Sequence, residues 1–454
     1  MELAIPELSL VLLVGPSGCG KSTFARRHFK PTEIVSSDHY RGVVCDDEAE
    51  QAASHHAFEL VHLAIRQRLI WRKLTVVDAT NLQPDVRRHL LEMARRAHYL
   101  ACAVVFDLPE ELCQQHNLAR AGRTVPAHVV TSHVQAAQRA AVAVEREPFA
   151  RRWLLRTPEE IEAATVRRVP LREDRRAEAG PFDIIGDVHG CIDELMSLLA
   201  LLGYQVGHTV GGDGGPVPFA VPPFGRRAVF VGDLCDRGPD SPSVLRLVAD
   251  MVRRGHAFSV LGNHDYKLLR HLRGNEVKPT HGLTGTLEQL AAHPPGLAAS
   301  VRDFLEGLPT HLVLDRGRLV VAHAGLREDL QGRVGGRVQA FALYGDTTGK
   351  TDDHGLPERR NWAAEYQGRA TVVYGHTPVR EPIWQGQTVN IDTGCVFGGR
   401  LTALRWPERE EVSVPARSSY ETHARPLLTL EMLLGHGGPT GVQYGEEADQ
   451  EGEP

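Results

Sequence analysis

Five short groups of polar residues, each directly after a strand-like run, constrain the fold of this sequence more than any other feature. The first group is Asp187-x-His189, which follows the run Phe182–Ile185. The other four, with the runs that precede them, are Asp233-Leu234-Cys235-Asp236-Arg237 after 228–231, Asn263-His264-Asp265 after 258–261, His323-Ala324-Gly325 after 319–322 and Gly375-His376-Thr377-Pro378 after 371–374. If these strands end at one edge of a sheet, every group reaches the same place.

The side chains in these groups are carboxylates, imidazoles and one amide, which are the types that hold two divalent cations in hydrolases. The predicted ligands form two sets that share one carboxylate: Asp187, His189 and Asp233 for the first cation, and Asp233, Asn263, His323 and His376 for the second. Such a mixture favours Mn²⁺, with Ni²⁺, Fe and Zn²⁺ as alternatives, over an all-oxygen Mg²⁺ site.

Four further residues near these ligands have candidate roles. Arg237 is placed to bind phosphate oxygens, His264 is a candidate general acid, and Asp236 is a candidate partner that orients the imidazole. Asp392, in the run Asn390-Ile391-Asp392-Thr393-Gly394, either belongs to the site or holds a turn. Both readings stay open.

A phosphate-binding loop is predicted near the N-terminus. The apolar run Leu8–Val14 reads as a buried parallel strand, and a Gly-rich segment ending in Lys21, Ser22 and Thr23 follows it. In this pattern backbone N–H groups surround the phosphates, the lysine reaches the β/γ oxygens and the serine hydroxyl meets Mg²⁺. We therefore predict that ATP and Mg²⁺ bind here. The predicted contacts are Gly15, Ser17, Gly18, Gly20, Lys21, Ser22 and Thr23.

The same part of the chain offers candidates for phosphoryl transfer. Asp38 follows a predicted strand and is placed to accept the proton of an attacking hydroxyl, with Arg41 nearby. A helix cap is the alternative role for this carboxylate. Asp78, at the end of another predicted strand, is placed to hold Mg²⁺ through water. Arg120 and Arg123 suit a lid that neutralises charge on the transferring group, although a solvated helix face is the other reading.

Length and composition set the outer limits. At 454 residues the chain should hold two or three domains, and its net charge of -6 leaves nucleic-acid contacts to local arginines. We predict a P-loop domain at 1–170, a linker at 171–180, a metal-binding domain at 181–407 and an extension at 408–454 whose end is disordered. Scattered cysteines, with no membrane-length apolar run and no basic signal segment, predict a cytoplasmic protein.

Several motifs of the first part carry a family resemblance. They are the P-loop, Ser36-Ser37-Asp38-x-x-Arg41, Val44-Cys45-Asp46-Asp47-Glu48 and Asp78-x-Thr80-Asn81. Together they resemble the 5′-polynucleotide kinase domain of bacterial RNA-repair polynucleotide kinase-phosphatases. The resemblance implies that Asp38 is the general base and that Arg41 engages the acceptor. The lid of that family carries another arginine where this chain has His116, which leaves the clamp to Arg120 and Arg123.

The second part resembles the calcineurin-like binuclear metallophosphoesterases. Its Gly-His-Thr-Pro form at 375–378 points to the branch that holds phosphoprotein phosphatases, symmetrical diadenosine tetraphosphatases and the phosphatase domain of the same RNA-repair enzymes. In that branch Asp236 and His264 form a recognised pair. Residues 275–287 resemble the RNA-repair members most closely. The implied architecture is an α/β P-loop domain, with a parallel sheet, flanking helices and a helical lid, followed by a β-sandwich with helices.

Together the two resemblances imply an end-healing enzyme. It would phosphorylate 5′-hydroxyl ends of RNA or DNA with ATP and remove 3′-phosphates or 2′,3′-cyclic phosphates. No ligase motif follows residue 407, so a separate RNA ligase or 3′-terminal RNA methyltransferase is an expected partner, and a homodimer is an open option. The alternative is a dinucleoside tetraphosphatase or Ser/Thr phosphoprotein phosphatase fused to a small-molecule kinase or to a regulatory ATP-binding domain.

Overall fold

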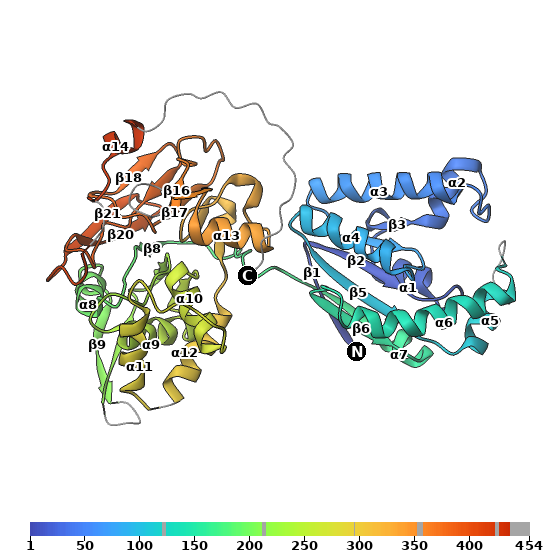
Figure 1. Cartoon of the computed structure of the whole chain (residues 1–454), viewed down its shortest axis with the longest axis horizontal. Helices are drawn as coiled ribbons and strands as arrows, with labels where there is room; N and C mark the ends of the chain where they lie inside the picture. Colours follow the sequence, from blue (N-terminus) through green and yellow to red (C-terminus); the bar gives the residue numbers. More distant parts are fainter. Residues whose placement is uncertain (120–123, 211–214, 295, 352–356, 423–425, 436–454) are drawn as a thin grey trace. The chain divides into compact units, whose positions relative to one another are not determined.

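The structure, a computed structural model, describes residues 1–119, 124–210, 215–294, 296–351, 357–422 and 426–435, and it divides into two compact units (Figure 1). The first unit comprises Met1–Ala179, Pro309–Gly317 and Glu328–Ala342, and the second comprises Gly180–Leu308, Arg318–Arg327 and Leu343–Pro454. Two later segments that the predicted boundaries gave to the second domain thus group with the first unit.

Contacts between distant parts of the sequence explain this grouping. Arg72 donates a hydrogen bond from Nη1 to the backbone oxygen of Gln331 over 2.9 Å, and Asp174 forms an isolated parallel bridge with Val313. Contacts between residues this far apart in sequence cannot be predicted from a local sequence pattern. A boundary drawn from composition therefore misses the two returning segments.

The first unit is built on a five-stranded, fully parallel sheet in the order β3-β4-β2-β5-β6. The strands are β2 (Ser9–Val14), β3 (Ile34–Ser36), β4 (Thr75–Asp78), β5 (Leu100–Phe106) and β6 (Arg151–Leu155). Every residue of central β2 is buried, as expected for a parallel strand covered on both faces. Its carboxyl end leads into the Gly-rich loop.

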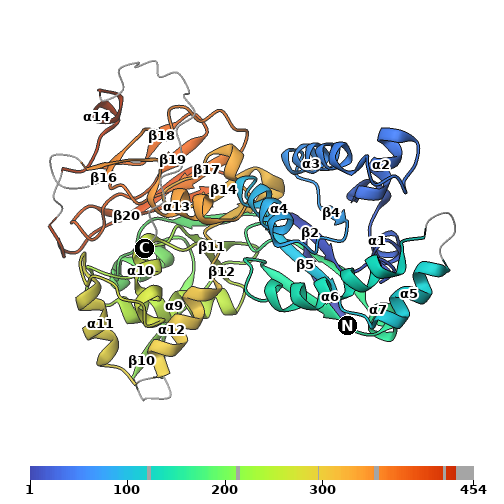
Figure 2. The ribbon, with the colours of Figure 1, turned by 45° about the vertical axis from the view of Figure 1, so that its right-hand side comes forward.

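Helices cover both faces of this sheet (Figures 1 and 2). On one face, α3 (Ser54–Ile70) and α4 (Pro84–Arg96) pack with Leu10 and Leu12 of β2. On the other, α1 (Lys21–His28) and α5 (Glu110–Leu118) pack with Val11 and Leu13, while α6 (Ala127–Val144) contributes to both cores. Alternate residues of one strand thus enter different cores. The predicted P-loop fold is confirmed.

Four more helices and strands of the N-terminal segment belong to the first unit. They are α2 (Ser37–Cys45), α7 (Pro158–Ala163), β1 (Glu2–Pro6) and β7 (Thr165–Val169). The last two form a separate parallel pair. The sequence analysis predicted neither strand. The two strands pair with each other although about 160 residues separate them, and no local sequence pattern indicates such a pairing.

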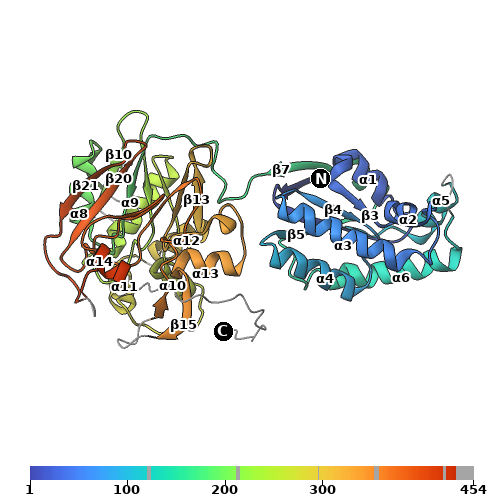
Figure 3. The same ribbon diagram turned by 90° about the horizontal axis from the view of Figure 1, so that it is seen from above.

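The second unit holds two main sheets rather than the single sheet edge suggested by the five polar groups (Figures 1 and 3). One runs β12-β11-β8-β20-β21, and the other contains β14, β17, β19 and β18 in that order. Their bounds are β8 (Phe182–Ile185), β11 (Arg227–Phe230), β12 (Ala257–Ser259), β20 (Arg400–Trp406), β21 (Glu410–Pro415), β14 (Leu319–Ala322), β17 (Thr371–Tyr374), β18 (Ile383–Gln385) and β19 (Thr388–Asn390). The ligand-bearing strands therefore come from both sheets of a calcineurin-like fold.

Helices and two hairpins surround these sheets. The helices that share the buried core of the first sheet are α8 (Ile192–Leu201), α9 (Ser241–Arg253), α10 (Asn263–Leu272), α11 (Leu283–Ala291) and α12 (Gly296–Gly307). The hairpins are β9 (Gln205–Val210) with β10 (Pro216–Val221), and β15 (Thr347–Thr351) with β16 (Pro357–Arg359). Leu343 of α13 (Gly336–Tyr344) also joins this core, although most of that helix belongs to the returning segments of the first unit, as does β13 (His311–Leu314). The last described helix is α14 (Leu430–Gly435).

The first sheet continues beyond residue 407, where the metal-binding domain was predicted to end. The turn after Trp406 joins β20 to β21, which pairs with it antiparallel from Arg400 with Pro415 to Arg405 with Glu410. A proline followed by charged residues resembles a domain end in sequence, but here it is a hairpin turn. In the described ranges, no helix combines the length and the apolar character needed to cross a bilayer.

Candidate functional site

The ends of four strands place most of the predicted metal ligands. Asp187 follows β8, Asp233 follows β11, His323 follows β14 and His376 follows β17, while Asn263 opens α10. Asp233 and His376 have φ angles of 48° and 71°, in the left-handed region that side chains rarely adopt. Strain of this kind persists where the surrounding structure holds a functional group in position.

One group of ligand atoms converges on His323. Its Nε2 lies 2.8 Å from Asn263 Oδ1, 2.9 Å from His376 Nδ1 and 3.3 Å from Asp233 Oδ2. Its Nδ1 lies 3.2 Å from the backbone oxygen of Val231, and donation to that oxygen leaves Nε2 unprotonated. Nitrogen and oxygen lone pairs facing one another in this way fit a divalent cation.

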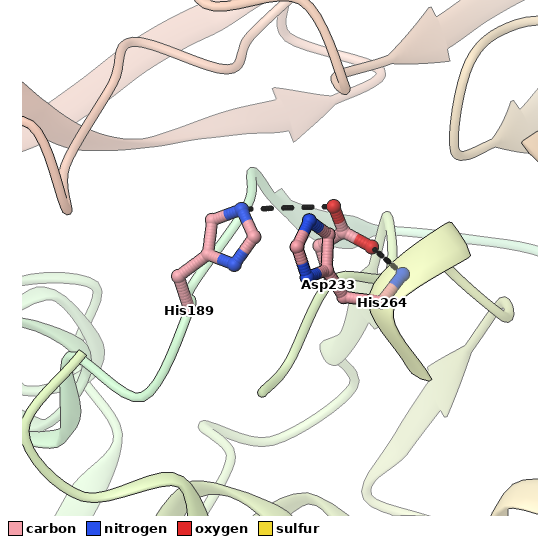
Figure 4. A group of neighbouring side chains, drawn as sticks. All are labelled: His189, Asp233 and His264. Carbon is pink, nitrogen blue, oxygen red and sulfur yellow. Dashed lines mark hydrogen bonds and ion pairs between the residues drawn. The ribbon is translucent and has the colours of Figure 1, made fainter. Parts of the chain in front are cut away.

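A second group gathers around the other side of Asp233 (Figure 4). His189 directs Nε2 toward Asp233 Oδ2 at 3.6 Å, and its Nδ1 lies 2.9 Å from the backbone oxygen of Cys235. Asp187 accepts a hydrogen bond from the backbone nitrogen of His376 on Oδ2, but its buried Oδ1 has no hydrogen-bond partner among the described residues. A buried carboxylate oxygen without a hydrogen-bond partner in the described residues, together with the Nε2 atom of His189, fits a first cation.

The charges of the site favour the same interpretation. Burial, then the Asp392 and Asp233 carboxylates, raise the pKa of Asp187 well above its usual value. For the pKa of Asp233, burial acts in the raising direction, but the effect of His323 and other nearby imidazoles is larger. The net result is a pKa well below the usual value of an aspartate. Burial lowers the pKa of His376, which keeps the ring neutral. When bound, two divalent cations would offset the crowded negative charge and supply Lewis-acid chemistry.

Asp392 combines both roles that the sequence left open. Its Oδ1 accepts a hydrogen bond of 3.1 Å from the backbone nitrogen of Gly394, which holds the turn. Burial raises its pKa to about 6, and its charge in turn raises the pKa of Asp187. It is therefore a turn residue that also shapes the electrostatics of the site.

His264 and Asp236 form a buried pair beside the ligands. His264 Nδ1 lies 2.7 Å from Asp236 Oδ2, and Thr286 donates to the other carboxylate oxygen over 2.6 Å. The His264 ring lies 4.9 Å from the His189 ring, centroid to centroid. A carboxylate held on both oxygens can orient an imidazole toward a leaving oxygen. Sequence reasoning gave Thr286 no role.

Replacing Thr286 by valine tests this arrangement. The variant removes one hydrogen bond to Asp236, so we expect kcat for an alkyl phosphate to fall about tenfold, whereas p-nitrophenyl phosphate, whose leaving group needs little protonation, should change by less than about twofold. Thr284→Val is the matched control, because Thr284 is exposed on the same helix and donates to the Pro279 carbonyl. An equal loss on both substrates would contradict an orienting role.

Two arginines face the ligand cluster. Arg237 Nη1 lies 3.0 Å from His189 Nε2, so the predicted phosphate-binding arginine lies beside a predicted metal ligand. Arg359 Nη2, from β16, lies 2.7 Å from His376 Nε2, and its Nε donates to the Tyr344 carbonyl over 3.1 Å. Burial lowers the pKa of Arg359. Sequence reasoning missed this arginine because no motif surrounds it, and only the fold brings the hairpin to the site.

Arg359→Ala should therefore weaken phosphate binding. Loss of a charged hydrogen-bond donor near the substrate should lower kcat/KM for phosphate monoesters by roughly 10- to 100-fold. Arg360→Ala is the control, because the neighbouring arginine is exposed and its ion pair with Asp346 spans 3.8 Å. Steady-state assays with p-nitrophenyl phosphate compare the two variants. Unchanged kcat/KM in Arg359→Ala would remove this residue from the site.

The first unit has a cavity of about 620 Å³ at the Gly-rich loop. Its lining includes Lys21, Ser22, Asp38, Arg41 and Asp78. The remaining predicted loop contacts except Gly15 also line it: Ser17, Gly18, Gly20 and Thr23. Gly15 instead packs tightly against Phe106 and Cys19, where an added Cβ would lie within 3 Å of both. Most of the predicted nucleotide contacts therefore surround one space.

Lys21 and Asp78 lie on the phosphate side of this cavity. Lys21 Nζ donates to the backbone oxygens of Gly15 at 2.9 Å and Pro16 at 2.7 Å. The Ser22 hydroxyl donates to Asp78, whose pKa is raised by burial. A hydroxyl and a carboxylate in contact at the start of α1 fit the Mg²⁺ of a bound nucleotide.

Asp38 and Arg41 line the same cavity from α2. The two side chains form an ion pair, and Arg41 also donates from Nε to the Glu48 carbonyl over 2.9 Å. Because Arg41 is buried and held on two sides, it positions the Asp38 carboxylate toward the cavity. Arg41 was predicted to contact the acceptor, and here it contacts the predicted base.

The lid residues can be followed only in part. Arg120 and Arg123 lie outside the described residues. His116, which stands where related kinases carry an arginine, lies with Nδ1 3.0 Å from the Gly18 carbonyl. His133 of α6 lies 3.1 Å from the Ser17 hydroxyl. Two imidazoles therefore contact the Gly-rich loop, and the sequence motif indicated only the first of them.

Comparisons with known proteins match each unit separately. Residues 10–144 match a family described as AAA domain, and residues 180–380 match the family Calcineurin-like phosphoesterase. The asymmetrical bis(5′-nucleosyl)-tetraphosphatase PrpE of Geobacillus sp. (strain WCH70) is 49% identical over 243 residues, which are 53% of this chain and 96% of that protein. The enzyme of the same name from Bacillus subtilis (strain 168) is 47% identical over 251 residues, covering 54% and 99%.

A solved structure of the Pnkp1/Rnl/Hen1 RNA repair complex is also similar, with 19% identity, a TM-score of 0.28 and coverage of 64% of this chain and 76% of that one. The fold and the site define an enzyme with a P-loop kinase-like domain and a metallophosphoesterase domain in one chain. Through its second unit, the chain belongs to the calcineurin-like phosphoesterase family.

Proposed function

We propose that this chain heals broken nucleic-acid ends. The first unit transfers the γ-phosphoryl group of ATP to a 5′-hydroxyl, and the second removes a 3′-phosphate or opens and clears a 2′,3′-cyclic phosphate. The observation that carries the kinase activity is the shared cavity of Lys21 and Asp38. A carboxylate that lines the same cavity as the phosphate loop can accept the proton of a hydroxyl as it attacks.

The pairing of the two units supports a polynucleotide as the substrate. Adding and removing phosphate on one small molecule would form a futile cycle, whereas the same reactions on the two sides of a break convert both ends for sealing. The motif Asp38-x-x-Arg41 favours a 5′-hydroxyl acceptor through its resemblance to polynucleotide kinases. The kinase would use ATP and Mg²⁺, and the phosphoesterase two cations such as Mn²⁺.

A second candidate concerns the phosphoesterase alone. Its relatives at 49% and 47% identity are named asymmetrical bis(5′-nucleosyl)-tetraphosphatases, and this supports hydrolysis of dinucleoside tetraphosphates. Such a substrate also offers phosphate oxygens to Arg237 and Arg359. On this alternative the first unit phosphorylates a small molecule or regulates the hydrolase.

Three substrates separate the candidates. The intact protein is given a 5′-hydroxyl oligonucleotide with γ-labelled ATP and Mg²⁺, a 3′-phosphate oligonucleotide with Mn²⁺, and diadenosine tetraphosphate with Mn²⁺. We expect label transfer to the first and a higher kcat/KM for the second than for the third. No transfer, together with rapid hydrolysis of diadenosine tetraphosphate alone, would favour the second candidate.

A further inference from the structure

A second group of ligand-type side chains lies in the phosphoesterase unit, apart from the binuclear ligands. The Sγ atoms of Cys191 and Cys395 and a carboxylate oxygen of Glu194 lie within 4.8 Å of one another. The exposed fractions of these residues are 0%, 2% and 1%. Both thiols are free. A buried cluster of two thiols and a carboxylate offers ligand types that Zn²⁺ binds in proteins.

Only one oxygen of the buried Glu194 carboxylate has hydrogen-bond partners in the described part of the chain. Its Oε1 accepts hydrogen bonds from the backbone nitrogen of Arg417 at 2.8 Å and from the Tyr420 hydroxyl at 2.9 Å. Its buried Oε2 has no hydrogen-bond partner in the described part of the chain. A buried carboxylate costs free energy unless a cation or further donors compensate it. A cation bound by Oε2 would provide that compensation.

Three segments that are distant in sequence meet at this cluster. Cys191 precedes α8 and Glu194 lies in its first turn, while Cys395 follows the turn held by Asp392. The third segment comes after β21, which lies beside α8 (Figure 3), and Tyr420 donates its backbone N–H to the Val396 carbonyl over 2.9 Å. Neither thiol nor Glu194 belongs to the ligand sets around Asp233.

We propose that Cys191, Glu194 and Cys395 bind a Zn²⁺ ion at a third metal site, separate from the binuclear centre. Two thiolates and one carboxylate provide three ligands of a tetrahedral site, and water completes the fourth position. Binding displaces two thiol protons to solvent. The ion would cross-link the loop after His189 with the loop after Asp392. Through the hydrogen bonds of Glu194 with Arg417 and Tyr420 it would also restrain the segment at 416–421.

Cobalt substitution in a variant with a damaged binuclear site tests the proposal. Full-length Asp233→Asn protein is stripped of metal with a chelator under reducing conditions and titrated with Co²⁺. Thiolate-to-cobalt charge transfer gives an ultraviolet absorption that imidazole and carboxylate ligands cannot produce. We expect this band to saturate at one Co²⁺ per chain and to disappear when Zn²⁺ is added. Absence of the band would overturn the proposal.

Three further variants, made in the same background, assign the ligands. Cys395→Ser leaves one thiolate and should reduce the band to half or less. Glu194→Gln keeps the shape and the two Oε1 hydrogen bonds but should weaken Co²⁺ binding by about 100-fold or more, since loss of a hydrogen-bond partner of a ligand already costs 10- to 100-fold. Cys102→Ala removes an equally buried thiol of β5 and should change nothing. An unchanged titration in Glu194→Gln, or a band of full intensity in Cys395→Ser, would contradict the assignment.

Discussion

Asp233→Asn should reduce phosphoesterase activity by about 1,000-fold or more while leaving kinase activity within about twofold. The reason is geometric, because one carboxylate oxygen serves both ligand groups. Oδ2 lies 3.3 Å from His323 Nε2 and 3.6 Å from His189 Nε2. A neutral amide of the same shape removes the charge that two cations share. It still accepts the hydrogen bond that Oδ1 receives from the backbone nitrogen of His264, so the fold should survive.

The measurement combines p-nitrophenyl phosphate hydrolysis in Mn²⁺ with the metal content of the purified protein. Asp240→Asn is the matched control, because Asp240 lies just beyond the same loop and caps α9 through Ser243, a role that asparagine also fills. We expect the control to retain full activity and metal. Retention of most activity by Asp233→Asn would contradict the bridging role, whatever happens to the kinase.

Much of the fold could be predicted because its strands are short and strongly apolar. The runs expected at 319–322 and 371–374 match β14 and β17 residue for residue, and β2 differs from its predicted run by one residue. In each case the strand is buried and ends where ligand-type residues begin. Local pattern and tertiary burial agree at these positions, so sequence alone was sufficient.

Other features depend on contacts between distant residues. The division of the five polar groups between two sheets follows from strand pairing, which hydrophobic periodicity does not encode. Arg359 reaches His376 from a hairpin with no motif of its own, and Thr286 reaches Asp236 across 50 residues. The cysteines near the catalytic loops are far apart in sequence and looked unrelated. Motifs identified the candidate catalytic and ligand residues, but not the residues that contact them from distant parts of the sequence.

Asp38→Asn should lower the rate of phosphoryl transfer to a 5′-hydroxyl oligonucleotide by about 100- to 10,000-fold, the usual contribution of a general base. The amide cannot accept the proton of the attacking hydroxyl. Lys21, Ser22 and Asp78 are unchanged in this variant, so ATP affinity should stay within about threefold. Single-turnover transfer from labelled ATP and equilibrium ATP binding measure the two quantities separately.

Controls distinguish loss of the base from loss of structure. The ion pair with Arg41 is weakened in Asp38→Asn, so Asp38→Glu, which restores the charge on a longer side chain, should recover part of the transfer rate. Asp85→Asn changes an exposed carboxylate in the first turn of α4 and should have no effect. Equal transfer by Asp38→Asn and the unmodified chain would exclude Asp38 as the base. A different result would indicate regulation: the unmodified chain transfers no phosphoryl group to the oligonucleotide, yet added ATP changes its phosphoesterase rate. Nucleotide binding in the first unit would then control the second unit.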